Sequence, residues 1–301
     1  MHRYGAYGLT FETDCTLPFP PADGDERAAI RIVFTGRTDR LGPTGRDRRD
    51  LTRSDHGWCL RYGDVAGNWV AYDFDRQRRR LDVSTNMGWE ECRYPLTGVV
   101  CGVLLSLEGG AVLHGSAIAH EGAGIVLIGD SGQGKSTLTA ALIEQGAQFL
   151  TDDIVALGLG PDGYAIAGGA RTLSLAPDAF AALEPGGFAE LAEQRHDRDK
   201  RLVVPHGHRL ASPLRAVFCL EAPDPARACS EAVLLSKRRG AMALLDNLYG
   251  TWIRPPGAAD LEFCGAVAEA TPIYLLKRPK ALAGLPGTVR VISKALGQAV
   301  G

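Results

Sequence analysis

The feature that most constrains this chain is the glycine-rich run Gly129–Ser136, whose letters are GDSGQGKS. It fits the Walker A pattern, in which glycines let the backbone fold closely around an anion and successive N–H groups point inward. The run 124–129 is apolar and predicts a buried strand, and the run 135–145 predicts a helix. Because the positive end of that helix favours an anion, the sequence predicts a phosphate-binding loop.

Nine consecutive residues are candidates for contact with a nucleotide. In this pattern the lysine, Lys135, reaches the β and γ phosphates, and the hydroxyl of Ser136 is a ligand of Mg²⁺. We therefore expect ATP and Mg²⁺ as the cofactors. The full candidate set is Gly129, Asp130, Ser131, Gly132, Gln133, Gly134, Lys135, Ser136 and Thr137.

Two adjacent carboxylates, Asp152 and Asp153, lie in the run 149–157, which predicts a single strand. If that strand lies in a parallel sheet with the strand before the Walker A run, the carboxylates come close to the phosphates. One of the two carboxylates would hold Mg²⁺, and the candidate metal ligands are Asp152 and Ser136. The other would accept the proton of an attacking hydroxyl group, and either aspartate fits that role of base.

His114 is the third candidate catalytic residue, on a strand predicted over 111–119. An imidazole beside the carboxylates would orient the nucleophile or contact a phosphate, and the alternative is an ordinary histidine of the core. Cations near a terminal phosphate neutralise its charge during transfer. The candidates for such phosphate or substrate contacts are Arg171, Lys200 and Arg201, and a solvated loop is the alternative for the last two.

The composition changes near Pro95. Before it, short alternating segments bounded by Gly, Asp or Pro predict strands, and the run 37–53, rich in Arg, Asp and Gly, predicts an exposed loop. After it, strands and helices alternate. We therefore expect two domains of an α/β protein: a smaller β-rich N-terminal domain over 1–95, and an α/β domain with the Walker A run over 96–301.

The net charge and the lengths of the apolar runs limit the classes of partner that we expect. With 33 Lys and Arg against 35 Asp and Glu, the net charge is -2, so no basic field exists to hold nucleic acid. The longest apolar stretches, 96–107 and 122–129, are shorter than the roughly 20 residues that cross a bilayer, and we expect no membrane partner. Seven cysteines without a C-x-x-C pair, and an N-terminus without an apolar leader, predict reduced thiols and a cytoplasmic location.

Three runs in this order, Leu113–Gly115, Gly129–Ser136 and Thr151–Asp153, resemble the catalytic domain of the HPr kinase/phosphorylase family. The resemblance is specific over 111–157 and looser to about residue 298. It implies the α/β P-loop fold that HPr kinases share with phosphoenolpyruvate carboxykinases, and ATP-dependent phosphorylation of a serine on a protein or peptide.

The resemblance also implies roles position by position. Lys135 and Ser136 would bind phosphates and Mg²⁺, Asp152 and Asp153 would supply the metal contact and the base, and His114 would assist at the reacting centre. The run 202–208 differs from the phosphorylase loop of that family, and the whole chain looks more like HPr-kinase-related proteins of peptide-modification clusters.

Some of those relatives phosphorylate the precursor of a lasso peptide. This implies a precursor peptide as the substrate, with the β-rich N-terminal domain helping to bind it. The alternatives are a kinase of HPr or a related phosphocarrier protein, and a nucleotide-binding regulatory module without phosphoryl transfer. The resemblance also allows a homo-oligomer.

Overall fold

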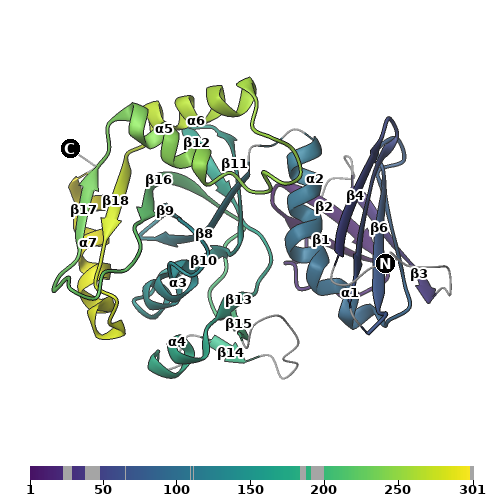
Figure 1. The fold of residues 1–301 in the computed structure, drawn as a ribbon, viewed down its shortest axis with the longest axis horizontal. Coiled ribbons are helices and arrows are strands. Elements are labelled where there is room, and N and C mark those ends of the chain that lie inside the picture. The colour runs from purple at the N-terminus through teal and green to yellow at the C-terminus, as the bar shows by residue number, and fades with distance from the viewer. Residues whose placement is uncertain are drawn as a thin grey trace. The chain divides into compact units, whose positions relative to one another are not determined.

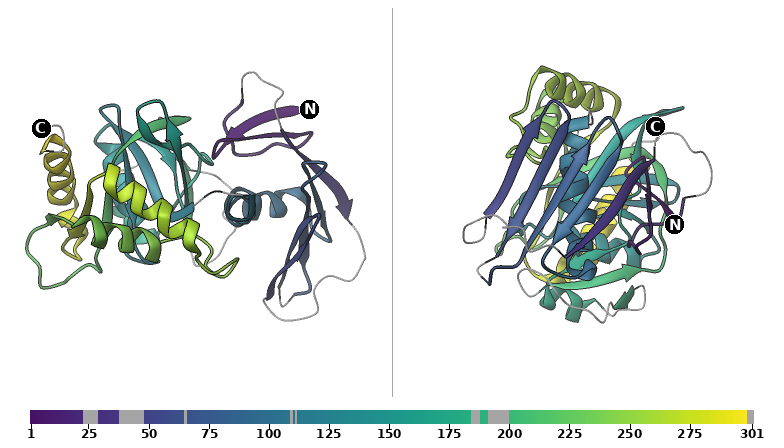
Figure 2. Two further views of the ribbon diagram at one scale, coloured as in Figure 1. Left: turned by 90° about the horizontal axis from the view of Figure 1, so that it is seen from above. Right: turned by 90° about the vertical axis from the view of Figure 1, so that its right-hand side faces the viewer.

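The computed structural model of the protein describes residues 1–22, 29–37, 48–64, 66–108, 110, 112–183, 188–190 and 200–298. The fold is mixed α/β. The chain divides into two compact units, Met1–Leu104 and Leu105–Gly301, which we call the N-terminal unit and the C-terminal unit (Figures 1 and 2). The domain boundary expected at 95/96 lies inside a continuous helical stretch. That stretch consists of α1 (Trp89–Pro95), the π-helix η1 (Leu96–Val100) and α2 (Cys101–Glu108).

The N-terminal unit is built on a seven-stranded sheet in the order β1-β2-β3-β7-β6-β5-β4. Inward side chains alternate along its strands, and Leu60, Tyr72 and Val83 are fully buried. The Tyr72 hydroxyl donates to the carbonyl oxygen of Cys92 (2.6 Å), which ties α1 to this sheet. The strands are β1 (His2–Ala6), β2 (Leu9–Thr13), β3 (Ile30–Arg37), β4 (Arg48–Ser54), β5 (Gly57–Gly63), β6 (Trp69–Asp75) and β7 (Arg80–Thr85).

The exposed loop expected over 37–53 is wrong where the structure describes it. Arg48–Ser54 form the edge strand β4, which pairs with β5 along its whole length. The backbone ladder of an edge strand needs no apolar residues, and exposed charges such as those of Arg49 and Arg53 suit an edge. Residues 38–47, which hold part of the expected loop, lie outside the described residues.

In the C-terminal unit, the two longest strands, β8 and β16, each pair with three other strands. β8 pairs with β9 on one side and with β10 and β11 on the other, and β16 pairs with β12, β9 and β18. The strands β13, β15 and β14 form a separate small sheet in the order β13-β15-β14. The strands are β8 (Val112–His120), β9 (Ala123–Ile128), β10 (Gln148–Thr151), β11 (Ile154–Gly160), β12 (Gly163–Ala167), β13 (Leu173–Leu175), β14 (Phe188–Glu190), β15 (Arg201–Pro205), β16 (Ala211–Leu220), β17 (Glu231–Leu234) and β18 (Ile273–Lys277).

Helices cover both faces of this sheet, which explains why β9 is apolar throughout. Ile125 and Leu127 pack in one core with residues of α3 and α7, whereas Val126 and Ile128 pack in another with residues of α5 and α6. Figure 1 shows these helix pairs on the two faces. The helices are α3 (Lys135–Glu144), α4 (Pro177–Ala182), α5 (Lys237–Asp246), α6 (Ala258–Ala270), the 3-10 turn η2 (Leu282–Gly284) and α7 (Leu285–Gln298).

Two expectations about the sheet need correction. The sheet is mixed, because β9, β16 and β18 run parallel while β8 runs antiparallel to both β9 and β10. β10 therefore runs in the direction of β9 with β8 between them. The single strand expected over 149–157 is also wrong, because it breaks at Asp152–Asp153, where Asp153 has a left-handed φ of 72°. None of the described helices is both long and apolar enough to span a bilayer.

Candidate functional site

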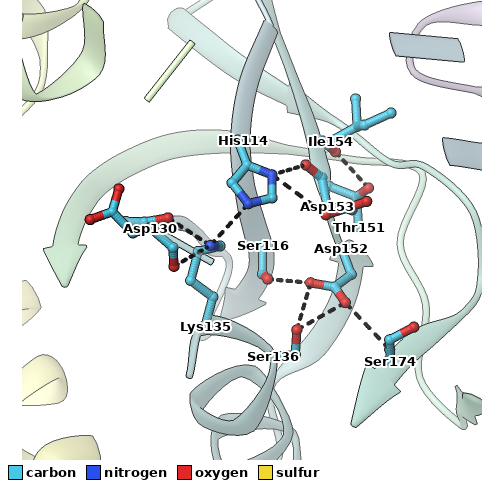
Figure 3. A network of polar contacts seen from close by, with 11 residues as sticks. His114, Ser116, Asp130, Lys135, Ser136, Thr151, Asp152, Asp153, Ile154 and Ser174 are labelled. Atoms are coloured by element: carbon cyan, nitrogen blue, oxygen red, sulfur yellow. Dashed lines mark hydrogen bonds and ion pairs between the residues drawn. The ribbon is translucent and has the colours of Figure 1, made fainter. Parts of the chain in front are cut away.

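Strand register brings the carboxylate pair to β8. Thr151 lies opposite Ala117 and Ile154 opposite His114, so the register is the same on both sides of the break. Asp152 and Asp153 therefore face Ser116 and Gly115 without continuing the regular ladder. The Thr151 hydroxyl donates to the Ile154 carbonyl oxygen (2.8 Å) and braces the break. Figure 3 shows both aspartates beside β8.

The segment Gly129–Ser136, which we call the Walker A segment after its sequence pattern, turns sharply between β9 and α3. Gly129, Gly132 and Gly134 have φ values of 145°, 85° and 75°, a region that side chains disfavour. The turn is closed by Gln133, whose side-chain oxygen accepts from the Asp130 N–H (2.9 Å) and whose amide donates to the Asp130 carboxylate (3.1 Å). The segment ends at the N-terminus of a ten-residue helix, where free N–H groups favour an anion.

Lys135 is the first residue of α3 and is only 7% exposed. Its Nζ donates to the carbonyl oxygens of Gly129 (2.6 Å) and Asp130 (3.1 Å), and lies 3.2 Å from His114 Nε2. Burial lowers the pKa of Lys135, and the carboxylates of Asp152 and Asp153 partly oppose that shift. A buried ammonium at a helix N-terminus is electrostatically unfavourable by itself and would be stabilised by an anion.

Asp152 is the more enclosed of the two aspartates. Its carboxylate accepts hydrogen bonds from the Ser116 hydroxyl, from the Ser136 hydroxyl (3.1 and 3.2 Å to the two oxygens) and from the Ser174 N–H (3.4 Å). Desolvation, and then the charge of Asp153, raise the pKa of Asp152, although these hydrogen bonds oppose the rise. Ser136 and Asp152, which we expected as metal ligands, therefore lie in direct contact.

Asp153 is exposed, with 64% of its side chain accessible, and lies beside His114. His114 Nδ1 lies 3.1 Å from the Asp153 carbonyl oxygen and 3.5 Å from its carboxylate. Since Nε2 faces the Lys135 ammonium, the contacts assign the proton of neutral His114 to Nδ1. His114 thus bridges Lys135 and Asp153, as Figure 3 shows, and its side chain is 30% exposed, unlike that of an ordinary core histidine.

The three cations expected to contact a phosphate or the substrate lie in different surroundings. Lys200 is exposed, and its charge contributes to the lowered pKa of Lys135, so it lies near the site. Arg201 lies with its guanidinium over the ring of Phe180 (4.8 Å) and is engaged with α4. Arg171 is partly buried, and its charge, after burial of the imidazole, is the next cause that lowers the pKa of His208. The remaining candidates, Ser131 and Thr137, lie in the Walker A turn and in α3, and neither touches the aspartates in the described contacts.

Sequence reasoning missed three contributors. Ser116 could have been found, because it lies two residues after His114 on one strand and therefore on the same face. The Ser174 N–H could not, because β13 reaches Asp152 only through tertiary folding. Arg278, directly after β18, was also missed: a Cβ on Gly134 would lie 3.0 Å from its Nη2.

The side chains that meet at Asp152, its own carboxylate and the hydroxyls of Ser116 and Ser136, offer oxygen ligands, which suit Mg²⁺. Among the described residues, no group of three or more His, Cys, Asp or Glu side chains could hold a metal ion. A metal at Ser136 and Asp152 would therefore need most of its ligands from substrate phosphates and water, which is how Mg²⁺ is usually held in nucleotide sites.

The fold and site define a mixed α/β protein in which a Walker A segment adjoins a histidine and a carboxylate pair. No family model matches the chain, and no curated protein matches it. Among solved structures, the chain is similar to the HPr(Ser) kinase/phosphatase from Coxiella burnetii. The identity is 12% and the TM-score 0.33, over 63% of this chain and 99% of that one.

Proposed function

We propose that the C-terminal unit is an ATP-dependent kinase that transfers the terminal phosphoryl group of ATP to a serine hydroxyl of a peptide or protein. One observation carries the proposal: His114 Nε2 lies 3.2 Å from the Lys135 ammonium while its Nδ1 lies 3.5 Å from the exposed Asp153 carboxylate. A cation suited to phosphate and an exposed carboxylate suited to a hydroxyl proton therefore flank one imidazole.

The Walker A segment supports the binding half of the proposal. Its N–H groups, the N-terminus of α3 and the Lys135 ammonium would bind the triphosphate. Lys135 would exchange its present carbonyl partners, Gly129 and Asp130, for phosphate oxygens. Ser136 and Asp152 would hold Mg²⁺, which when bound neutralises charge on the phosphates. Asp152 suits this role because a cation would offset the repulsion between its partly buried carboxylate and the carboxylate of Asp153.

The exposure of Asp153 supports its role as the base, since Asp152 is already engaged by three donors. In the proposed step, the serine oxygen attacks the γ-phosphorus as its proton passes to the Asp153 carboxylate. The bond from the γ-phosphorus to the bridging oxygen breaks, and its electron pair stays on ADP. His114, held by the Asp153 carbonyl oxygen, would orient the acceptor hydroxyl or the transferred group.

The substrate we propose is a linear precursor peptide of the lasso type, as the sequence resemblance implies. The seven-stranded sheet of the N-terminal unit supports peptide binding, because its edge strand β4 could pair with an extended chain, whereas the outer edge of β1 already bonds to Pro20 and Ala22. The alternative substrate is HPr or a related phosphocarrier protein. A linear peptide should suffice in the first case, whereas the second requires a folded carrier.

The test is a phosphorylation assay with Mg²⁺ and ATP labelled at the γ-phosphate. Serine-containing precursor peptides and folded HPr would be the acceptors, and mass spectrometry would locate the phosphate. We expect labelled peptide with the wild-type protein and none with Lys135→Ala, because the triphosphate loses its ammonium partner. Lys294→Ala on the exposed side of α7 is the matched control and should keep full activity.

Three results would count against the proposal. Full activity in Lys135→Ala would show that the Walker A segment is not the site that binds ATP. Labelling of HPr but not of linear peptides would replace the peptide by a phosphocarrier. Tight ATP binding with no acceptor phosphorylated would favour a regulatory nucleotide-binding module.

A further inference from the structure

Arg278 lies at the Walker A segment with a fixed backbone. It directly follows β18, its carbonyl oxygen accepts from the Asp224 N–H (3.1 Å), and the Lys280 N–H donates to the Asp224 carbonyl oxygen (3.1 Å). Pro279 completes a bridge to the same Asp224. The segment that carries Arg278 is thus held on both sides of this residue.

The Arg278 side chain is buried, and none of the residues that the structure describes pairs with it. Only 7% of the residue is exposed, and neither Nε nor Nη2 has a hydrogen-bond partner among the described residues. Burial lowers the pKa of Arg278, and no carboxylate of the described residues offsets this effect. Arg254 shows the ordinary case, since its guanidinium donates to both oxygens of Asp260 and to the Ser106 carbonyl oxygen. An unpaired buried guanidinium is unfavourable and indicates a missing anion.

The guanidinium of Arg278 lies against the start of α3. A Cβ built on Gly134 would be 3.0 Å from Nη2, 3.6 Å from Nη1 and 3.7 Å from Cζ. Gly134 is the residue before the first turn of this ten-residue helix, whose free N–H groups attract anions. Two independent features, an unpartnered buried cation and a helix N-terminus, thus meet at one point.

Strand order distinguishes this cation from Lys135. β9 lies between β8 and β16, and β18 lies beyond β16. The Lys135 ammonium faces His114 on β8, whereas Arg278 follows β18 on the opposite side of the Walker A segment. A polyphosphate that spans the segment would have its reacting end near β8 and its other end near β18.

We propose that Arg278 binds the diphosphate part of the nucleotide, the part that leaves as ADP, and not the phosphoryl group that is transferred. This inference rests on the proposed kinase function. Arg278 would hold ATP and ADP equally well, in the ground state as in the transition state. Its loss would therefore raise the KM for ATP and leave kcat nearly unchanged.

The test compares Arg278→Met and Arg278→Lys with the wild-type protein in binding and thermal unfolding. The probes are inorganic tripolyphosphate, ADP, and ATP with Mg²⁺. Their binding is measured by calorimetry and by the shift in Tm. In Arg278→Met we expect the Kd for tripolyphosphate and for ADP to rise about 10–100-fold, as for the loss of charge-assisted hydrogen bonds. Arg278→Lys should lose less affinity, because it keeps the charge.

Stability without ligand gives a second readout. Because Arg278→Met removes an unpaired buried charge, we expect its Tm without ligand to equal or exceed that of the wild type. The matched control is Arg254→Met, which breaks a paired guanidinium. That control should lower Tm and leave the Kd for ADP unchanged.

The outcomes separate the two proposals. If Lys135→Ala abolishes tripolyphosphate and ADP binding but Arg278→Met binds both as the wild type does, the inference fails and the kinase proposal stands. A fall in kcat at unchanged KM in Arg278→Met would place the residue at the transferred group and overturn the inference. Clear destabilisation of Arg278→Met without ligand would show a structural partner and would also overturn it. If the wild type binds none of the probes, both proposals fall.

Discussion

Gly115 has little room for a side chain beside the candidate site. It lies on β8 between His114 and Ser116, and a Cβ there would stand 2.6 Å from the Leu127 carbonyl oxygen and 3.3 Å from Ile128 Cγ2. The first of these neighbours is backbone of β9 and cannot rotate away. The substitution Gly115→Ala must therefore push β8 and β9 apart.

The size of the effect follows from these distances. Real Cβ contacts are almost never shorter than 3.0 Å, so the strands must separate by about 0.4 Å (3.0 minus 2.6). Overpacking of this kind destabilises by about 1–3 kcal/mol. For a domain of this size each kcal/mol lowers Tm by about 2–4 °C, so we expect a fall of about 2–12 °C.

The same shift would disturb the site. Lys135 Nζ lies 3.2 Å from His114 Nε2, and a displacement of β8 would carry that pair toward the limit of a hydrogen bond. We expect the phosphorylation rate to fall by about tenfold or more, since small misplacements of catalytic groups are costly.

Thermal unfolding followed by circular dichroism, with initial rates of phosphorylation, checks this prediction. Gly158→Ala on β11 is the matched control, because a Cβ there meets nothing within 4 Å. The control should keep its Tm and its activity. If Gly115→Ala were as stable and as active as Gly158→Ala, the close approach of β8 and β9 would not be what this position requires.

Two further predictions concern the aspartates. Asp153→Asn should lower kcat by about 10² or more if this residue is the base, with ADP release as the assay and the exposed Asp162→Asn as the control; an unchanged kcat would exclude the role. Because burial raises the pKa of Asp152 in the folded state, its contribution to stability is greatest below the ordinary pKa and is lost as pH rises through the folded value. The Tm of Asp152→Asn relative to wild type should therefore be higher at pH 7 than at pH 4, and Mg²⁺ with ATP should stabilise only the wild type; an equal difference in Tm at both pH values would refute the burial argument.

Local sequence predicted the elements next to the Walker A segment because their signals are local. The apolar run before Gly129 is β9, and the helix expected over 135–145 is α3. Gly146 ends α3 with a left-handed φ of 89°, as expected of a glycine that terminates a helix. Such features depend on side-chain pattern and backbone freedom over a few residues, which are visible in the letters.

Other features depend on which strands become neighbours. The run 149–157 looks like one strand, yet Asp153 takes a left-handed conformation and divides it into β10 and β11. Both halves pair with β8 in one register, and the Thr151 hydroxyl, which donates to the Ile154 carbonyl oxygen, spans the break. Ser174 and Arg278 belong to the same category, since each reaches the site from a distant segment.

The sequence by itself determined that Gly129–Ser136 would turn closely between a buried strand and a helix, because glycine spacing and apolar runs act over short distances. It also determined the residue types available for phosphate, metal and proton. Only the tertiary structure decided that Asp152 would be enclosed by hydroxyl groups and Asp153 left exposed. It also decided that Arg278 would be buried with no partner in the described part of the chain. The physical reason is that burial and charge pairing are properties of neighbours in space, and strand register and packing choose those neighbours.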